Sequence, residues 1–179
     1  MLQHEGDPSR CAVLLPGIRY FSQAPLLWFT REAAQAGGWS VVEVDERAPR
    51  DQEPFEWMRG QAERALEAAS GAERVVVIGK SLGSVAATLV DGPAVWLTPL
   101  LNQPEVAAAI GSATAPALLV GSTADPTWAG GAPRENESIE VLELEGLDHS
   151  LQVTGDPTSS LAVLGDVTAR VGAFLERLS

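Results

Sequence analysis

The sequence contains few of the residues that build disulfide or metal scaffolds. Its 179 residues include one cysteine and two histidines. A single cysteine, Cys11, cannot form an intramolecular disulfide, and together with His4 and His149 it cannot complete a zinc site made of Cys and His. Disulfide and zinc scaffolds are therefore excluded as the main source of stability, and we expect a hydrophobic core to supply it.

Basic residues and long hydrophobic runs are also scarce. Twelve Lys and Arg residues stand against 24 Asp and Glu residues, so the formal net charge is −12. Such a surface repels nucleic-acid phosphates and anionic lipids, which disfavours both as partners. Hydrophobic stretches end well before the roughly 18 residues that a membrane-spanning helix needs. The first ten residues lack the apolar core of a signal peptide. We therefore expect a cytoplasmic protein that does not bind membranes.

Short apolar runs alternate with amphipathic stretches of helical length. The runs typical of buried strands are Cys11–Leu15, Ser40–Val44, Val75–Ile78, Ala94–Leu97, Ala117–Val120 and Ile139–Leu144. The stretches typical of helices are Leu26–Ala36, Pro54–Ala69, Leu82–Val90, Pro104–Ile110 and Leu161–Leu178. This alternation predicts an α/β fold, a three-layer α/β/α sandwich whose mainly parallel sheet has about six strands. We expect one domain over residues 1–179, with residues 1–10 as a polar N-terminal tail.

The segment Gly79-Lys80-Ser81-Leu82-Gly83 joins an apolar strand directly to a helix of small residues. This is the G-x-S-x-G pattern in its strand–turn–helix setting. So tight a turn strains the serine backbone, and side chains two residues before and after it would collide with the neighbouring strand and helix. The N–H of Leu82 is then one donor of an oxyanion hole. The pattern indicates a nucleophilic Ser81, and the alternative is a serine that caps a helix.

The residues Gly79-Lys80-Ser81 also match the end of a phosphate-binding P-loop. That motif requires a glycine five residues before Gly79, where the sequence has Arg74, and a flexible loop where Val75–Ile78 forms a strand. The P-loop interpretation is therefore excluded. Lys80 is the only lysine in the chain. We interpret it as half of a structural ion pair, with attraction of an anionic substrate as the alternative.

A serine nucleophile needs an adjacent base, and the chain offers two histidines. His149 follows the strand Ile139–Leu144, so it lies at the sheet edge that also carries Ser81. His4 belongs to the polar tail, where a solvated side chain is expected. The position of His149 therefore predicts that it is the general base, although a satisfied structural histidine is the alternative.

The carboxylate that orients the base is expected between the serine and the histidine, also at a strand end. Asp125 is the first carboxylate after the strand Ala117–Val120. Its predicted role is to hold the tautomer of His149 and to stabilise the imidazolium. Asp148 and Glu145 are alternatives, but Asp148 adjoins the histidine in sequence and is better explained as a turn residue.

Other site residues are predicted from their place at strand ends. The turn at Pro16-Gly17 follows an early strand, and the N–H of Ile18 is predicted to be the second oxyanion donor, with that of Arg19 as the alternative. The other interpretation of Pro16-Gly17 is an ordinary turn with no role in an oxyanion hole. Leu100 and Trp128 are candidate walls of a substrate pocket, with packing on the sheet edge as the other interpretation.

Together these residues resemble the α/β-hydrolase superfamily, whose triad follows the chain order Ser…Asp…His. The resemblance extends from Cys11 to the last helix and implies a minimal fold without a cap domain. It further implies a serine hydrolase that cleaves a small-molecule acyl ester or thioester through an acyl-enzyme, with Ser81, Asp125 and His149 as the triad. No metal or cofactor is expected. The alternative is a non-catalytic protein of the same fold that binds a small molecule or a protein partner.

Overall fold

The computed structural model describes residues 1–129 and 131–178, and within them seven strands form one sheet in the order β1-β3-β2-β4-β5-β6-β7. The strands are β1 (Leu2–His4), β2 (Asp7–Leu15), β3 (Trp39–Glu43), β4 (Arg74–Lys80), β5 (Ala94–Leu97), β6 (Ala117–Ser122) and β7 (Ile139–Leu144). The helices are α1 (Pro25–Ala36), α2 (Pro54–Ala68), α3 (Pro104–Gly111) and α4 (Pro157–Arg177), with 3₁₀ segments η1 (Ser81–Thr88) and η2 (Pro126–Trp128). All neighbouring strands run parallel except β1 and β3.

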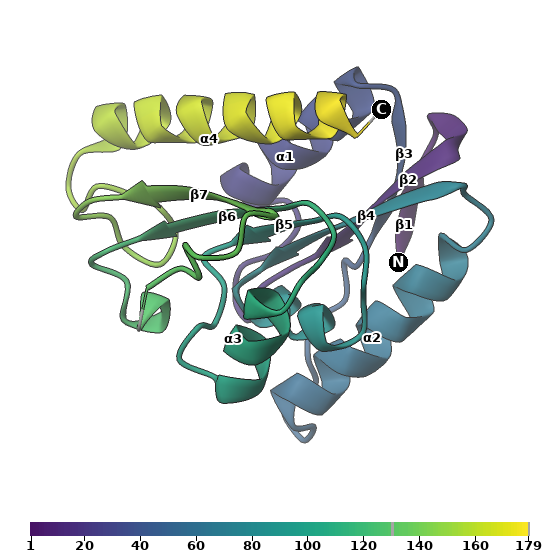
Figure 1. Ribbon diagram of the computed structural model, residues 1–179, viewed down its shortest axis with the longest axis horizontal. Helices are drawn as coiled ribbons and strands as arrows, with labels where there is room; N and C mark the ends of the chain where they lie inside the picture. The colour runs from purple at the N-terminus through teal and green to yellow at the C-terminus, as the bar shows by residue number, and fades with distance from the viewer. Residues whose placement is uncertain (130, 179) are drawn as a thin grey trace.

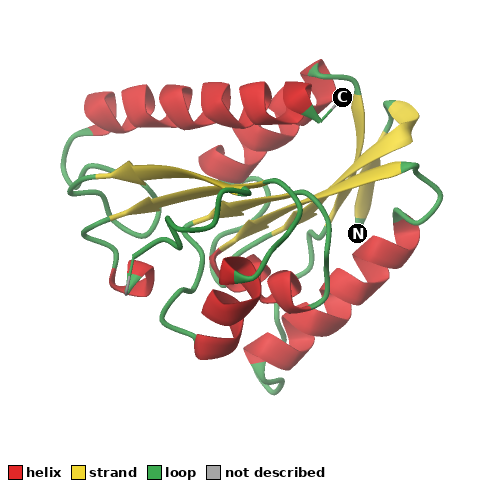
Figure 2. Ribbon diagram, viewed as in Figure 1, coloured by secondary structure: helices red, strands yellow, loops and turns green. Residues whose placement is uncertain are grey.

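Helices cover both faces of the sheet (Figures 1 and 2). In Figure 1, α1 and α4 lie above the sheet and pack against each other, while α2, η1 and α3 lie below it. Side chains of β2 alternate between the two faces of the sheet. Val13 and Leu15 belong to the core cluster between the sheet and α2 and α3, and Ala12 and Leu14 belong to the cluster between the sheet and α1 and α4. The predicted three-layer fold with a mainly parallel sheet is confirmed.

The N-terminal residues correct the prediction of a polar tail. Residues Leu2–His4 form the edge strand β1, in which Leu2 pairs with Glu43, and β2 begins at Asp7 rather than at Cys11. The ring of His4 also bonds to the buried carboxylate of Glu43, with Nε2 3.0 Å from Oε2. The strand forms because the outer edge of β3 has backbone groups to pair, not because its own residues are apolar.

The helix after Ser81 is also tighter than predicted. The expected α-helix Leu82–Val90 is a 3₁₀ helix that covers Ser81–Thr88. Two of its hydroxyls bond to carbonyls three residues earlier: Ser84 donates to Ser81 at 2.6 Å, and Thr88 donates to Val85 at 2.9 Å. These bonds favour the narrower 3₁₀ winding.

The four α-helices begin at proline residues, Pro25, Pro54, Pro104 and Pro157. Proline suits the first helical position because its missing N–H would have no helical partner there. Across residues 1–129 and 131–178, none of the helices combines the length and the hydropathy required to cross a bilayer.

Candidate active site

Ser81 lies at the sharp turn between β4 and η1. The backbone of Lys80 is extended, with φ −106° and ψ 126°, and Ser81 then adopts φ 53°. This left-handed conformation is unfavourable for a residue with a Cβ. The hydroxyl of Ser84 donates to the carbonyl of Ser81 and accepts the N–H of Leu100 at 3.1 Å, which holds the strained turn in place. Ser81 is 5% exposed.

The glycines on either side of Ser81 are required by space. A Cβ on Gly79 would lie 2.7 Å from both the carbonyl oxygen of Gly83 and the ring of Trp96 on β5. A Cβ on Gly83 would lie 2.4 Å from the carbonyl oxygen of Leu15 on β2. The collisions predicted from the G-x-S-x-G pattern are therefore confirmed, and two of the three involve backbone atoms that have little room to move.

This packing yields a stability prediction. Gly83→Ala is expected to lower the free energy of unfolding by about 3 kcal/mol, because β2 and η1 must separate to admit the new methyl group. Gly60→Ala is the matched control, since Gly60 lies in α2 and an added Cβ would meet nothing within 4 Å. The control should gain about 0.5–1 kcal/mol from helix propensity. Urea denaturation measures both, and equal midpoints for the two variants would contradict the packing argument.

The structure brings Ser81, His149 and Asp125 into one hydrogen-bonded chain. Nε2 of His149 lies 2.7 Å from Oγ of Ser81, and Nδ1 lies 2.7 Å from Oδ2 of Asp125. The Asp125 side chain is fully buried, while the imidazole is 35% exposed. The three residues follow β4, β6 and β7, whose carboxyl ends meet at one edge of the parallel sheet. This arrangement allows a proton to pass from the hydroxyl to the imidazole.

Thr127 is a site residue that the sequence analysis missed. Its N–H and its hydroxyl both donate to Oδ1 of Asp125 at 2.9 Å, and the hydroxyl lies 3.1 Å from Nδ1 of His149. Asp125 thereby caps η2 while its other oxygen faces the imidazole. The signal was available, because Asp-Pro-Thr is a pattern typical of an aspartate that bonds its own backbone two residues later.

Neither alternative carboxylate bonds to the imidazole. Oδ1 of Asp148 accepts the N–H groups of Ser150 at 2.8 Å and of Gln152 at 3.0 Å, so this carboxylate organises the loop that carries His149. Glu145 is exposed. Asp148 thus forms a turn, as the sequence analysis favoured.

Lys80 is buried beside the triad, and the predicted ion pair is wrong. The side chain is 1% exposed, and no carboxylate of the described residues lies within ion-pair distance of it. Its Nζ instead donates to the carbonyl of His149 at 3.1 Å and lies 4.6 Å from the ring centroid of Tyr20. Burial lowers the pKa of Lys80 to about 8, although the charges of Asp125 and Asp148 oppose the shift. Lys80 therefore anchors the loop that carries the imidazole.

This lowered pKa predicts a pH dependence of stability. Between about pH 8 and its ordinary pKa of 10.5, Lys80 binds more protons in the unfolded chain than in the folded chain. Its contribution to the free energy of unfolding therefore rises with pH in that window, and it is unfavourable below about pH 8. We expect the stability of the wild type relative to Lys80→Met to increase between about pH 8 and 10, as measured by urea denaturation. A difference that is flat or falls over this window would contradict the burial of a charged lysine.

The turn after β2 lies directly against the nucleophile. A Cβ on Gly17 would be 3.1 Å from Cβ of Ser81, a tight contact that favours glycine here, and the positive φ of the turn, 58°, occurs at Arg19 instead. Gly17 and Tyr20 exchange two backbone hydrogen bonds, of 3.2 and 3.3 Å. Within the described residues, the N–H of Ile18 at the corner of this turn has no intramolecular acceptor. Leu82 is the second residue of η1, where an N–H has no helical partner.

The candidate pocket residues are packed differently from the prediction. Trp128 is 5% exposed, belongs to the core, and donates its indole N–H to Glu143 at 2.7 Å. Its ring fills the space above Gly121, where an added Cβ would lie 2.0 Å from it. Leu100 is half-buried against the same core cluster. Both residues therefore follow the alternative interpretation of packing against the sheet, because Trp128 turns inward and fills the space beside Gly121.

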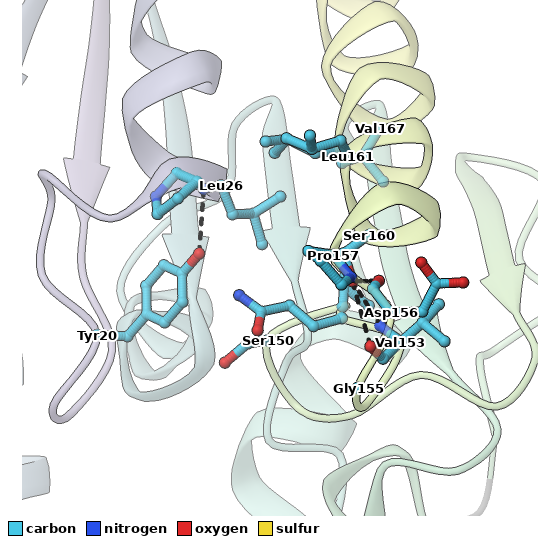
Figure 3. A pocket seen from close by; sticks show the side chains of 14 residues that line it. Tyr20, Leu26, Ser150, Val153, Gly155, Asp156, Pro157, Ser160, Leu161 and Val167 are labelled. Carbon is cyan, nitrogen blue, oxygen red and sulfur yellow. Dashed lines mark hydrogen bonds between the residues drawn. The ribbon is translucent and has the colours of Figure 1, made fainter.

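A cavity of about 450 Å³ lies beside the loop that carries His149 (Figure 3). Tyr20 and Leu26 lie on one side, where the Tyr20 hydroxyl accepts the N–H of Leu26 at 3.0 Å. Val153 and Pro157 lie opposite them, and Leu161 projects from α4. The lining is mainly apolar, and it includes Ser150, the residue after the histidine.

Comparisons with solved structures show the same fold at low sequence identity. No family model and no curated protein matches the sequence. Mouse alpha/beta hydrolase domain-containing protein 10 is 12% identical, with a TM-score of 0.71 over 99% of this chain and 94% of that chain. Est1E from Butyrivibrio proteoclasticus, determined with ferulic acid bound, is 14% identical, with a TM-score of 0.67 over 97% and 92% of the two chains. The esterase Pf2001 from Pyrococcus furiosus is 15% identical, with a TM-score of 0.67 over 94% and 83%. The chain thus has the fold of the α/β-hydrolase superfamily.

Proposed function

We propose that this protein is a serine hydrolase that cleaves a small acyl ester or thioester. The observation that carries the proposal is the chain Ser81–His149–Asp125, in which both hydrogen bonds are 2.7 Å long. A hydroxyl, an imidazole and a buried carboxylate in this order form a nucleophile, a base and an orienting acid. The esterases from Pyrococcus furiosus and Rhodothermus marinus have the same fold, which supports this reaction class.

The first half-reaction transfers the acyl group to the protein. Oγ of Ser81 attacks the acyl carbon while Nε2 of His149 takes the hydroxyl proton, and the carbonyl electrons move onto oxygen. Backbone N–H groups of Leu82 and Ile18 donate to that oxyanion. Collapse of the intermediate breaks the bond to the alcohol or thiol, which leaves with the proton from His149. The acyl group then remains on Ser81.

The second half-reaction returns the protein to its starting state. Water attacks the acyl carbon as His149 takes one of its protons, and a second tetrahedral intermediate collapses to a carboxylic acid. Ser81 regains its proton from His149. Asp125 stays ionised throughout and holds Nδ1–H, so that Nε2 faces the serine. Because Ser81 and His149 supply the nucleophile and the base, the proposed reaction needs no metal or cofactor.

The cavity beside His149 supports a substrate with a small apolar group. Its volume of about 450 Å³ and its aliphatic lining suit a short chain or a small ring rather than a polymer. Ser150, which follows the base in the sequence, is one of the residues that line this cavity, so the loop that carries His149 also forms part of the cavity wall.

A panel of chromogenic substrates tests the proposal. We expect turnover of 4-nitrophenyl acetate and butyrate that exceeds turnover of the octanoate ester, and comparison with the matched acetyl thioester identifies the preferred leaving group. His149→Ala should reduce turnover by about 10³-fold or more. If no ester or thioester is hydrolysed and a fluorophosphonate forms no adduct, the alternative of a non-catalytic binding protein with this fold would be favoured.

A further inference from the structure

A second cavity adjoins the turn that faces Ser81. It has a volume of about 700 Å³ and lies between the loop from β2 to α1 and the loop from β3 to α2. Gly17 and Ile18 form one wall, and Trp57 at the start of α2 is also part of the lining. Gly17 lies between this cavity and the nucleophile. It is close to the nucleophile, because a Cβ built on Gly17 would lie 3.1 Å from Cβ of Ser81.

Three arginines line this cavity in a chain whose net charge is −12. They are Arg19, Arg47 and Arg50, and all three are exposed. Within residues 1–129 and 131–178, none of them has a carboxylate within 4.0 Å, and the same holds for Arg64 and Arg74 elsewhere in the chain. The remaining arginines, Arg10, Arg31, Arg59, Arg134, Arg170 and Arg177, each have at least one. The guanidinium of Arg47 lies 4.0 Å from the ring centroid of Phe21, which restricts its motion.

The two carboxylates at this cavity have partners of their own. Glu46 accepts from the N-terminal ammonium of Met1 at 2.6 Å, and this contact lowers the pKa of Glu46. Asp45 accepts the hydroxyl proton of Ser22 at 3.0 Å. The N–H donors of the three arginines are therefore not directed at protein carboxylates. The lining therefore has three arginines against two carboxylates, and one of these carboxylates, Glu46, is paired with the N-terminal ammonium. This excess of positive groups on an acidic protein favours an anion at the cavity.

We propose that this cavity binds an anionic group of the substrate, a carboxylate or a phosphate, while the ester carbonyl lies on the turn at Ile18. This inference rests on the proposed hydrolase function. Guanidinium groups bind carboxylate and phosphate oxygens with two parallel hydrogen bonds, which explains the use of arginine here. The preferred substrates are then esters that carry a negative charge several bonds from the scissile carbonyl. The apolar cavity beside His149 holds the uncharged part.

Matched esters test the inference. Mono-4-nitrophenyl glutarate and 4-nitrophenyl pentanoate have acyl chains of equal length, and only the first ends in a carboxylate; a 4-phosphonobutyrate ester supplies the phosphate-like arm. We expect kcat/KM to be at least about tenfold higher for one of the anionic esters than for the pentanoate. The double variant Arg47→Gln/Arg50→Gln should remove most of this preference. Arg170→Gln, which changes the same charge on α4 away from the cavity, should keep it.

A binding measurement separates this inference from the proposed reaction. Calorimetry on Ser81→Ala should show that monomethyl glutarate binds more tightly than methyl pentanoate, and that Arg47→Gln/Arg50→Gln abolishes the difference. Equal preference for neutral and anionic esters, or a preference that survives the double variant, would overturn the anionic subsite while leaving ester hydrolysis intact. If no ester is hydrolysed but the calorimetric difference is found, the hydrolase proposal fails and the anion site stands. If neither is found, both fail.

Discussion

Ser81→Ala is expected to lower kcat/KM for 4-nitrophenyl acetate by about 10⁴- to 10⁶-fold, because no other hydroxyl stands 2.7 Å from Nε2 of His149 among the described residues. The fold should persist. Within residues 1–129 and 131–178 the Ser81 side chain has no hydrogen bond besides the one to His149, and the backbone carbonyl of residue 81 still accepts the hydroxyl of Ser84. Thermal unfolding of the variant measures the second expectation. Residual turnover within tenfold of the wild type would contradict a nucleophilic role.

The strain at the same position predicts an unusual stability series. Glycine adopts a φ of 53° without penalty, whereas alanine and serine do not. Ser81→Gly is therefore expected to unfold with a free energy about 1 kcal/mol higher than that of Ser81→Ala. Both variants lack the hydroxyl, so their difference isolates the backbone conformation. Equal stability of the two would show that the turn relaxes.

Asp125→Asn is expected to lower kcat by about 10⁴-fold. The amide can donate to Nδ1 of His149, which would move the ring proton to Nε2, the nitrogen that lies 2.7 Å from Ser81. The imidazole would then present a donor to the serine and could not accept its proton. Asparagine keeps the shape of the side chain and the oxygen that Thr127 bonds, so circular dichroism should show an unchanged fold.

Thr127→Val is the matched control for this variant. It removes a hydroxyl that bonds to Asp125 at 2.9 Å, but it leaves both the carboxylate and the imidazole in place. Its activity should stay within about tenfold of the wild type, the scale of one charge-assisted hydrogen bond. If Asp125→Asn were as active as Thr127→Val, the carboxylate would have no special role in orienting the histidine.

Patterns within short stretches of the sequence predicted the strands and the turn at Ser81, because residues close together in the sequence determine both. Each of the six expected strands exists. The central strands β4, β5 and β6 are buried on both faces and therefore form continuous hydrophobic runs, whereas the edge strand β7 is half-buried and includes Glu140 and Glu143. The turn at Ser81 could also be predicted, since Gly79 and Gly83 stand where a side chain would collide with the adjacent strand and helix. Parallel topology then placed His149 and Asp125 at the same sheet edge.

Features that depend on distant contacts were not predictable. β1 forms only because β3 offers an open edge, and the partners of Lys80, the Tyr20 ring and the carbonyl of His149, come from loops 60 and 69 residues away in the sequence. Gly17 was identified as a turn residue, but its close approach to Ser81, which leaves little room for a side chain, was not predicted. The cavity lined by Arg19, Arg47 and Arg50 is formed by two separate loops, and no pattern in the sequence indicates that these loops lie side by side.

Mass-spectrometric mapping of a fluorophosphonate adduct is the most direct test of the hydrogen-bonded chain as a nucleophilic centre. Fluorophosphonates react with a serine only when a base removes its proton and an oxyanion site receives the phosphoryl oxygen. We expect one adduct per chain, on the peptide that contains Ser81, and its loss in both Ser81→Ala and His149→Ala. An intact protein that stays unlabelled at a large excess of probe, or one labelled at a different serine, would contradict it.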